Sequence, residues 1–184
     1  MASNFERKEH LYKNEAFGEL VKDAVRFFNG TPVHTLPPPN VFLGTGVYAL
    51  YYTGQNPTYG KYAELNRLAY LFPIYVGKAV PTGWRQARVS ATELNQSNEL
   101  FRRLREHSKS ISCSSDLILS DFSCRFIIFE SETSDMISTI EAALIKLNRP
   151  LWNTALDGFG NQDLPGCNAS QSDIACSYLP LPGS

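Results

Sequence analysis

Two tyrosine-rich segments carry side chains that could take part in acid–base chemistry. Residues 46–53 read GVYALYYT, and residues 73–79 read PIYVGKA. Because successive side chains of a strand point to opposite faces, Tyr48 falls on one face of the first segment, and Tyr75 falls opposite Lys78 in the second. If the segments pair, opposed residues lie roughly 4.5 to 5.5 Å apart, so the two phenols would serve one site. Ordinary sheet packing is the alternative, since tyrosine is a favoured strand residue.

An arginine and a histidine follow at helical spacing. Arg103 and His107 are four residues apart, so they project from one face of a helix expected over residues 96–109, beside Leu100 and Leu104. A guanidinium can stabilise charge on a phosphate, and an imidazole can hold or relay a proton. The alternative is an exposed helix on which this spacing arises by chance.

A glutamate falls at the edge of another predicted apolar stripe. A helix is expected after Thr133 or Ser134. Its stripe consists of Ile137, Ile140, Leu144 and Leu147. Glu141 lies about 40° around this helix from Ile137, at the boundary of the buried face. A carboxylate at such a place is destabilising unless it is paired or bound to a metal, so a boundary salt bridge is the alternative to a metal site.

The apolar pattern also predicts the elements that must position these groups. Asn14 caps an amphipathic helix over residues 14–29, and Gly30 ends it. The remaining elements are, in order, an extended proline-rich connector (31–40), the first tyrosine strand, an insertion with a short helix before Pro73, the second tyrosine strand, the 96–109 helix, a third strand (121–130), the glutamate helix and an extended exit (151–153). The expected class is α/β (α+β), with a small central antiparallel three-stranded sheet flanked by helices.

Length and composition limit the class of protein. The 184 residues are 43% hydrophobic and 19% charged, which suits one globular domain. The N-terminal segment has charges but no apolar core, and no run approaches the roughly 20 apolar residues of a membrane span. We therefore expect a soluble cytoplasmic protein without membrane association. The four cysteines form no CxxC pair, so the pattern indicates neither a zinc site nor a disulfide framework.

Basic residues are concentrated in one part of the chain. The net charge is −1, but residues 78–109 alone carry a net charge of +4. Such a local field can hold a polyanion, although a solvated arginine-rich helix face would give the same pattern. Within this part, Trp84, Arg85 and Arg88 fall on a loop or short helix, and Arg102 falls on the following helix. Arginine binds guanine edges or phosphates, so Arg85, Arg88 and Arg102, together with Trp84, are candidates for contact with DNA. Ordinary surface charge is the alternative for each arginine alone.

Taken in order, these residues resemble the GIY-YIG nuclease superfamily. Its two strand motifs correspond to Gly46-Val47-Tyr48 and Tyr75-Val76-Gly77. Its other marks match Lys78, Arg103, His107, Glu141 and Asn153, the last in a P-x-x-N exit. The resemblance covers about residues 44–155, and the two valines are conservative departures. The long insertion between the motifs, together with GWRQAR and DGFGN, is similar to the type II restriction enzymes of this superfamily, particularly those that cut CCGCGG.

The resemblance implies metal-dependent hydrolysis of double-stranded DNA at a specific, GC-rich palindrome, in a prokaryotic cytosol. Glu141 would hold one Mg²⁺ or Mn²⁺ per active site, without a nucleotide cofactor, and Arg103 would hold the transition-state charge. Tyr48 would take a proton from the attacking water, with Tyr75, Lys78 and His107 tuning it or completing a relay. Asn153 would orient the site. Tyr48 and His107 both remain candidates for the general base.

A lowered pKa is expected for Tyr48 on this interpretation. Lowering a tyrosine pKa of about 10 by roughly three units requires about 4 kcal/mol. One cation at roughly 4 Å supplies about that much at an effective dielectric of about 20.

The remaining expectations concern organisation and partners. A single domain over residues 1–184 would consist of an N-terminal helix and connector (1–43), a catalytic core (44–155) and a tail (156–184). Phe159 and Asn161 of the tail are expected to contact a DNA groove. One active site per chain and two DNA strands suggest a homodimer on DNA. The alternatives are a structure-specific repair or homing-type nuclease and a non-catalytic DNA-binding protein on this scaffold.

Overall fold

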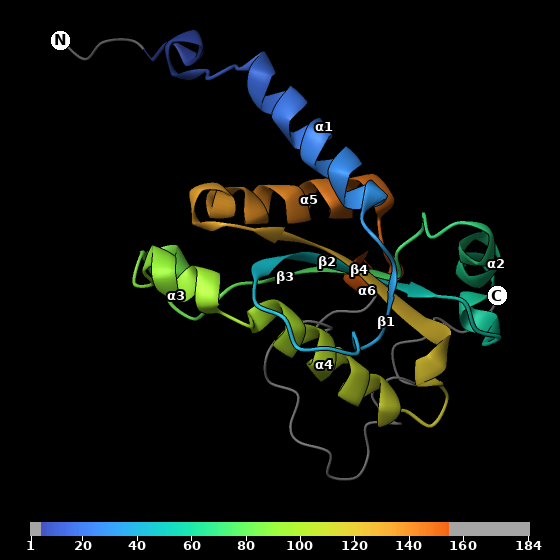
Figure 1. Cartoon of the computed structure of the whole chain (residues 1–184). Helices are drawn as coiled ribbons and strands as arrows, with labels where there is room; N and C mark the ends of the chain where they lie inside the picture. Colours follow the sequence, from blue (N-terminus) through green and yellow to red (C-terminus); the bar gives the residue numbers. More distant parts are fainter. Residues whose placement is uncertain (1–4, 155–184) are drawn as a thin grey trace.

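The computed structural model describes residues 5–154, which form one sheet with helices on both faces (Figure 1). The strands are β1 (His34–Thr35), β2 (Thr45–Tyr52), β3 (Tyr75–Ala79) and β4 (Phe122–Phe129). The α-helices are α1 (Glu15–Gly30), α2 (Gly60–Leu68), α3 (Ala91–Gln96), α4 (Glu99–Ser112), α5 (Ile137–Asn148) and α6 (Leu151–Thr154). The 3₁₀ helices are η1 (Arg7–His10), η2 (Pro57–Tyr59), η3 (Trp84–Gln86), η4 (Leu119–Asp121) and η5 (Ser131–Met136).

The sheet is antiparallel, in the order β1-β4-β2-β3. The predicted mixed class and its antiparallel sheet are confirmed, but the sheet has four strands instead of three. The additional strand β1 is two residues of the proline-rich connector, His34 and Thr35, which pair with Cys124 and Ser123. Such a short pairing leaves no alternating pattern in the sequence, because it depends on the position of β4.

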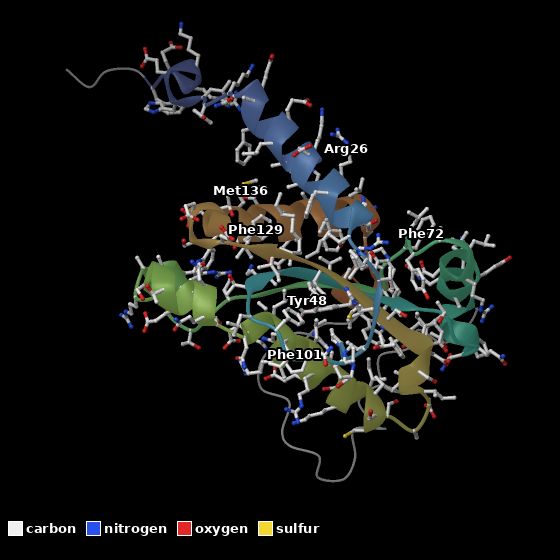
Figure 2. The ribbon with its side chains drawn as sticks, in the orientation of Figure 1. Arg26, Tyr48, Phe72, Phe101, Phe129 and Met136 are labelled. Carbon is white, nitrogen blue, oxygen red and sulfur yellow. The ribbon has the colours of Figure 1, made fainter. Side chains whose placement is uncertain are left out.

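Each face of the sheet has its own core. Tyr48, Leu50 and Tyr52 of the central strand β2 pack with α4 on one face. The alternate residues of β2 pack with α5 and the C-terminal part of α1 on the other face. Figure 2 shows Tyr48 on the α4 side of the sheet and Phe129 on the α5 side. The strand β3 forms one edge of the sheet, so groups from both faces can meet there.

The N-terminal helix differs from its expected packing. Asn14 caps α1 as predicted, accepting a hydrogen bond from the backbone N–H of Phe17. Only Phe28 of the helix is buried, whereas Phe17 and Leu20 are 51% and 49% exposed. The reason is visible in Figure 1, where the N-terminal half of α1 extends away from the sheet and α5.

Two local expectations are wrong, and the bounds of a third element differ. The predicted 96–109 helix is α4, which begins at Glu99 and ends at Ser112, and the short helix α3, with a Ser90 capping box, precedes it. The exit at residues 151–153 is helical, because Asn153 and Thr154 donate to the Pro150 carbonyl and form one turn. Leu147, placed on the buried stripe of α5, is 66% exposed. Within residues 5–154, no helix is long and apolar enough to cross a membrane.

Candidate active site

Tyr48 and His107 form the centre of the candidate site. Tyr48 is 2% exposed in the middle of β2, and its hydroxyl lies 2.7 Å from Nε2 of His107 on α4. Leu100 and Leu104 of the same helix are fully buried beneath the sheet. Their packing turns the next residue of the stripe, His107, toward Tyr48, and Arg103 emerges one turn earlier with its side chain 20% exposed.

Tyr75 approaches Tyr48 diagonally. The register places Gly77 opposite Tyr48 and Leu50 opposite Tyr75, so the expectation of directly opposed tyrosines is wrong. The phenol rings nevertheless lie 6.0 Å apart between centroids, and the ring of Tyr75 lies 5.0 Å from that of His107. Diagonal neighbours on one face of a sheet are within reach of aromatic side chains, so the two hydroxyls still share one site.

Gly77 makes room for the Tyr48 phenol. A Cβ atom at this position would lie 2.8 Å from the Tyr48 hydroxyl and 2.9 Å from its Cζ, which is closer than real Cβ contacts. The phenol therefore extends from the central strand across Gly77 toward the β3 edge. The sequence motif contains this glycine, but its role becomes apparent only from the register.

The charges around the two phenols come from opposite sides of the sheet. Burial is the main cause that raises the pKa of Tyr48 well above its usual value, with a further increase from Tyr75, while the charge of Arg103 opposes it. Burial is also the main cause that raises the pKa of Tyr75, and the carboxylate of Glu141 adds to the increase for both phenols. The expected lowering of the Tyr48 pKa is wrong for the protein alone, because desolvation outweighs the nearby arginine.

His107 is held neutral. Burial, and then the charge of Arg103, lowers its pKa to about 4. The imidazole therefore has no charge at neutral pH, and it shares its hydrogen bond with a phenol that keeps its own proton. A neutral imidazole of this kind can accept a proton from a neighbouring hydroxyl when its Nε2 is the unprotonated ring nitrogen.

Lys78 and Glu141 form an ion pair on the α5 face. Lys78 alternates with Tyr75 and Gly77 along β3, so it points to the face that α5 covers, where its Nζ donates to Oε2 of Glu141. Each side chain is 19% exposed. The boundary carboxylate is thus paired, as the sequence required of it.

Glu141 also suits a hard divalent cation. Within residues 5–154, no group of three or more His, Cys, Asp or Glu residues is arranged to hold a metal ion. Mg²⁺, however, is commonly bound by only one or two carboxylates, with water and phosphate oxygens completing its shell. A single carboxylate beside the two phenols therefore fits a cation that is shared with a phosphate.

Asn153 joins the site to the free edge of β3. Its Oδ1 accepts from the Val76 N–H and its Nδ2 donates to the Val76 carbonyl, both at 2.8 Å. The N–H of Trp152 also donates to the carbonyl of Ile74. The α6 turn therefore holds the backbone between Tyr75 and Gly77 in place.

Comparison with known families gives a match over most of the chain. The model of the family described as the Eco29kI GIY-YIG domain matches residues 40–174. The chain belongs to the Eco29kI GIY-YIG family. This is a family of type II restriction endonucleases, and GIY-YIG nucleases generally use divalent metal ions and act on DNA. None of the curated proteins compared with the chain matches it.

The predicted DNA-contacting residues of this Eco29kI GIY-YIG domain lie in two different settings. Arg85 and Arg88 are exposed on and beside η3, and within residues 5–154 no ion pair engages either guanidinium. Trp84 is half-buried at the start of η3. Arg102 instead bridges two carboxylates of its own helix, Glu99 at 2.5 Å and Glu106 at 2.6 Å. Phe159 and Asn161 lie outside the described residues.

Glu106 is a site residue that sequence reasoning missed. Its carboxylate accepts from Arg103 at 3.1 Å as well as from Arg102. The signal was present, because Glu106 is three residues after Arg103 and four after Arg102. In this Eco29kI GIY-YIG domain, Glu106 holds the Arg103 guanidinium at the edge of the site.

The lowered pKa of His107 predicts a measurable dependence of stability on pH. Between pH 6.5 and pH 4 the unfolded chain binds a proton on His107 that the folded protein does not, so stability falls as the pH falls. The expected loss is on the order of 2 kcal/mol between pH 7.5 and pH 4.5. Urea unfolding at both pH values should show this loss in the wild type and a correspondingly smaller one in His107→Gln. Equal pH dependence in the two proteins would contradict the neutral, buried imidazole.

Proposed function

We propose that this protein is a type II restriction endonuclease, which cuts double-stranded DNA at a specific, GC-rich palindrome with the help of a divalent cation. The observation that carries the proposal is the convergence at the β3 edge. The Tyr48 and His107 hydrogen bond lies there in the electrostatic range of both Arg103 and Glu141. CCGCGG is the proposed recognition sequence because of the resemblance to enzymes that cut it.

The proton relay follows from the two shifted pKa values. Tyr48 keeps its proton at neutral pH and His107 is uncharged, so neither group alone is a preformed strong base. As the water attacks phosphorus, its proton passes to the Tyr48 oxygen while the phenol proton passes to Nε2 of His107. Tyr48 ends neutral and His107 ends as imidazolium, which the negative charge on the phosphate stabilises. The two candidate bases thus act together.

Other residues have positioning and electrostatic roles in this proposal. Arg103 binds the scissile phosphate and stabilises its transition-state charge, while Tyr75 and Lys78 orient groups around it. Asn153 holds the backbone that carries Tyr75 and Gly77. A Mg²⁺ or Mn²⁺ ion bound at Glu141 would neutralise charge at the leaving 3′-oxygen.

DNA recognition is assigned to residues on and beside η3, to one residue of α4 and to two residues outside the described part of the chain. Arg85 and Arg88 are the leading candidates, because no ion pair within the described residues competes for them. Trp84 lies beside them, and Arg102 would contact a phosphate by exchanging its carboxylate partners. Phe159 and Asn161 complete the proposed set. The core is proposed to span residues 44–155 of a single domain.

Digestion of plasmid DNA separates this proposal from its alternatives. Two plasmids that differ by one CCGCGG site should be incubated with the protein, with and without Mg²⁺. The proposal expects discrete fragments only with Mg²⁺ and only from the plasmid that contains the site. Discrete fragments produced at another sequence would support a restriction enzyme with a recognition sequence other than CCGCGG. Nicking only at branched substrates would indicate a repair-type nuclease. Binding without Mg²⁺-dependent cutting would indicate a non-catalytic DNA-binding protein.

A homodimer on DNA is part of the proposal, and α1 supports it. The N-terminal half of α1 extends from the body (Figure 1) and exposes the apolar side chains of Phe17 and Leu20, and Phe27 is exposed nearer the C-terminal end of the helix. A two-fold dimer would bury this stripe and present one active site to each DNA strand.

Negative charges introduced at Phe17 and Leu20 are predicted to prevent dimerisation. The Phe17→Glu/Leu20→Glu double variant should sediment as a monomer on and off DNA, because dimerisation would bury two carboxylates, and it should nick one strand instead of cutting both. Lys22→Glu, which adds negative charge on the polar side of α1, is the control and should remain dimeric on DNA. Sedimentation velocity at equal protein concentrations measures the difference. A wild-type protein that is monomeric on its DNA would contradict the dimer.

A further inference from the structure

The ion pair between Lys78 and Glu141 places a cation where a metal ion would bind. Nζ of Lys78 donates directly to Oε2 of Glu141, and both side chains are four-fifths buried. The two residues come from rigid elements, the edge strand β3 and the helix α5, which pack against each other. The contact is therefore built into the fold of the free protein.

The charges around this carboxylate leave little attraction for a second cation. Lys78 neutralises Glu141 directly, while the charges of Glu141 and Arg103 both act on Tyr48 and Tyr75. Within the described residues, Glu141 belongs to no group of three or more His, Cys, Asp or Glu side chains that could hold a metal ion. A divalent ion that approaches the carboxylate of the free protein therefore meets the Lys78 ammonium at short range.

We propose that Lys78 competes with the divalent cation for Glu141 and keeps the cation affinity of the free protein low. This inference rests on the proposed function, since Glu141 is taken as the metal-binding carboxylate. A phosphodiester that enters the site offers its oxygens to both cations. The Lys78 ammonium then moves from the carboxylate to the phosphate, and Glu141 becomes available to the metal. The residue thereby links cation binding to the arrival of DNA.

The Lys78 side chain is long and flexible enough to exchange Glu141 for a phosphate. Lysine is a flexible point charge on a four-carbon stem, so its ammonium can change partners without movement of β3. Its neighbour Gly77 lies under the Tyr48 hydroxyl, so the base of the Lys78 side chain is one residue from the phenol that would face the phosphate. A purely structural salt bridge would stabilise β3 against α5 without affecting cation binding.

Binding of Mn²⁺ to the DNA-free protein tests the inference without measuring cleavage. The electron paramagnetic resonance signal of free Mn²⁺ gives its dissociation constant for the wild type and for four variants. Lys78→Met removes the ammonium, and Lys78→Gln removes the charge but keeps a hydrogen-bond donor for Glu141, in case the first variant does not fold. Lys146→Met is the matched control, because Lys146 is an exposed lysine on the same helix as Glu141. Glu141→Gln removes the proposed ligand.

The expected result is an Mn²⁺ affinity at least about tenfold higher in Lys78→Met and Lys78→Gln than in the wild type, with little change in Lys146→Met. The thermal midpoint of both Lys78 variants should also rise more on addition of Mn²⁺, since binding to the folded state stabilises it. Unchanged or weaker Mn²⁺ binding in both Lys78 variants would overturn the inference. If both Lys78 variants bound Mn²⁺ as the wild type does while Glu141→Gln lost binding, the inference would fail but the proposed metal site would still stand. If Glu141→Gln bound Mn²⁺ as the wild type does, the assignment of Glu141 as the metal ligand would fail.

Discussion

Replacing Tyr48 with phenylalanine is expected to reduce DNA cleavage by about a thousandfold while leaving the fold and DNA binding intact. The variant keeps the ring that packs in the core and removes only the hydroxyl that lies 2.7 Å from His107. Without that oxygen, the water proton has no path to the imidazole. Single-turnover cleavage of a labelled duplex measures the rate, and a gel-shift titration of the same duplex measures binding.

Tyr52→Phe is the matched control for this experiment. Tyr52 lies on the same strand and the same face, is 1% exposed, and its hydroxyl accepts a hydrogen bond from the backbone N–H of Asn56. Both variants therefore delete a buried hydroxyl from β2, but only one deletes it from the proposed relay. If Tyr48→Phe cut DNA as fast as Tyr52→Phe, Tyr48 would have no part in proton transfer.

Replacing Glu141 with alanine is expected to abolish Mg²⁺-dependent cleavage, with a loss of about a thousandfold or more, because stabilisation of charge by a bound metal is worth several kcal/mol. DNA binding should persist or strengthen, since the variant removes a negative charge from a site that receives a phosphate. Cleavage rates measured across a range of Mg²⁺ concentrations should show no recovery at high Mg²⁺.

Two further variants separate the metal role of Glu141 from its structural role. Glu141→Gln keeps an acceptor for Lys78 and should remain folded, yet it should cleave as poorly as the alanine variant. Glu132→Ala removes an exposed carboxylate from the segment before α5 and should cleave normally. Cutting by Glu141→Ala at the wild-type rate would remove Glu141 from the metal site.

Much of the site could be predicted from sequence because its groups sit on strongly periodic elements. The stripe of Leu100 and Leu104 fixes which way Arg103 and His107 project, since a helix repeats every 3.6 residues. Alternation along β3 fixes that Lys78 and Tyr75 face opposite sides. The boundary position of Glu141 required a partner, and the ion pair with Lys78 meets that requirement.

The features that sequence could not supply depend on contacts between distant elements. The diagonal placement of Tyr75 follows from the register with β2, which neither strand specifies alone. The direction of the Tyr48 pKa shift was misjudged because nearby cations were counted and desolvation by the sheet and α4 was not. The exposure of Phe17 could not be predicted from the sequence either, because an amphipathic pattern shows that one face of a helix is apolar but not what covers that face.

The hydrogen bonds between the Asn153 amide and Val76 affect how the edge of the sheet can pair with another molecule. The edge strand of a sheet presents unpaired backbone N–H and C=O groups, which can hydrogen-bond to a strand of another molecule and start aggregation. The Asn153 carboxamide hydrogen-bonds to one backbone donor and one backbone acceptor of β3, as a neighbouring strand would, but it does so at a single residue. Because the Asn153 amide occupies the N–H and the C=O of Val76, these two backbone groups are not available to a strand from another molecule.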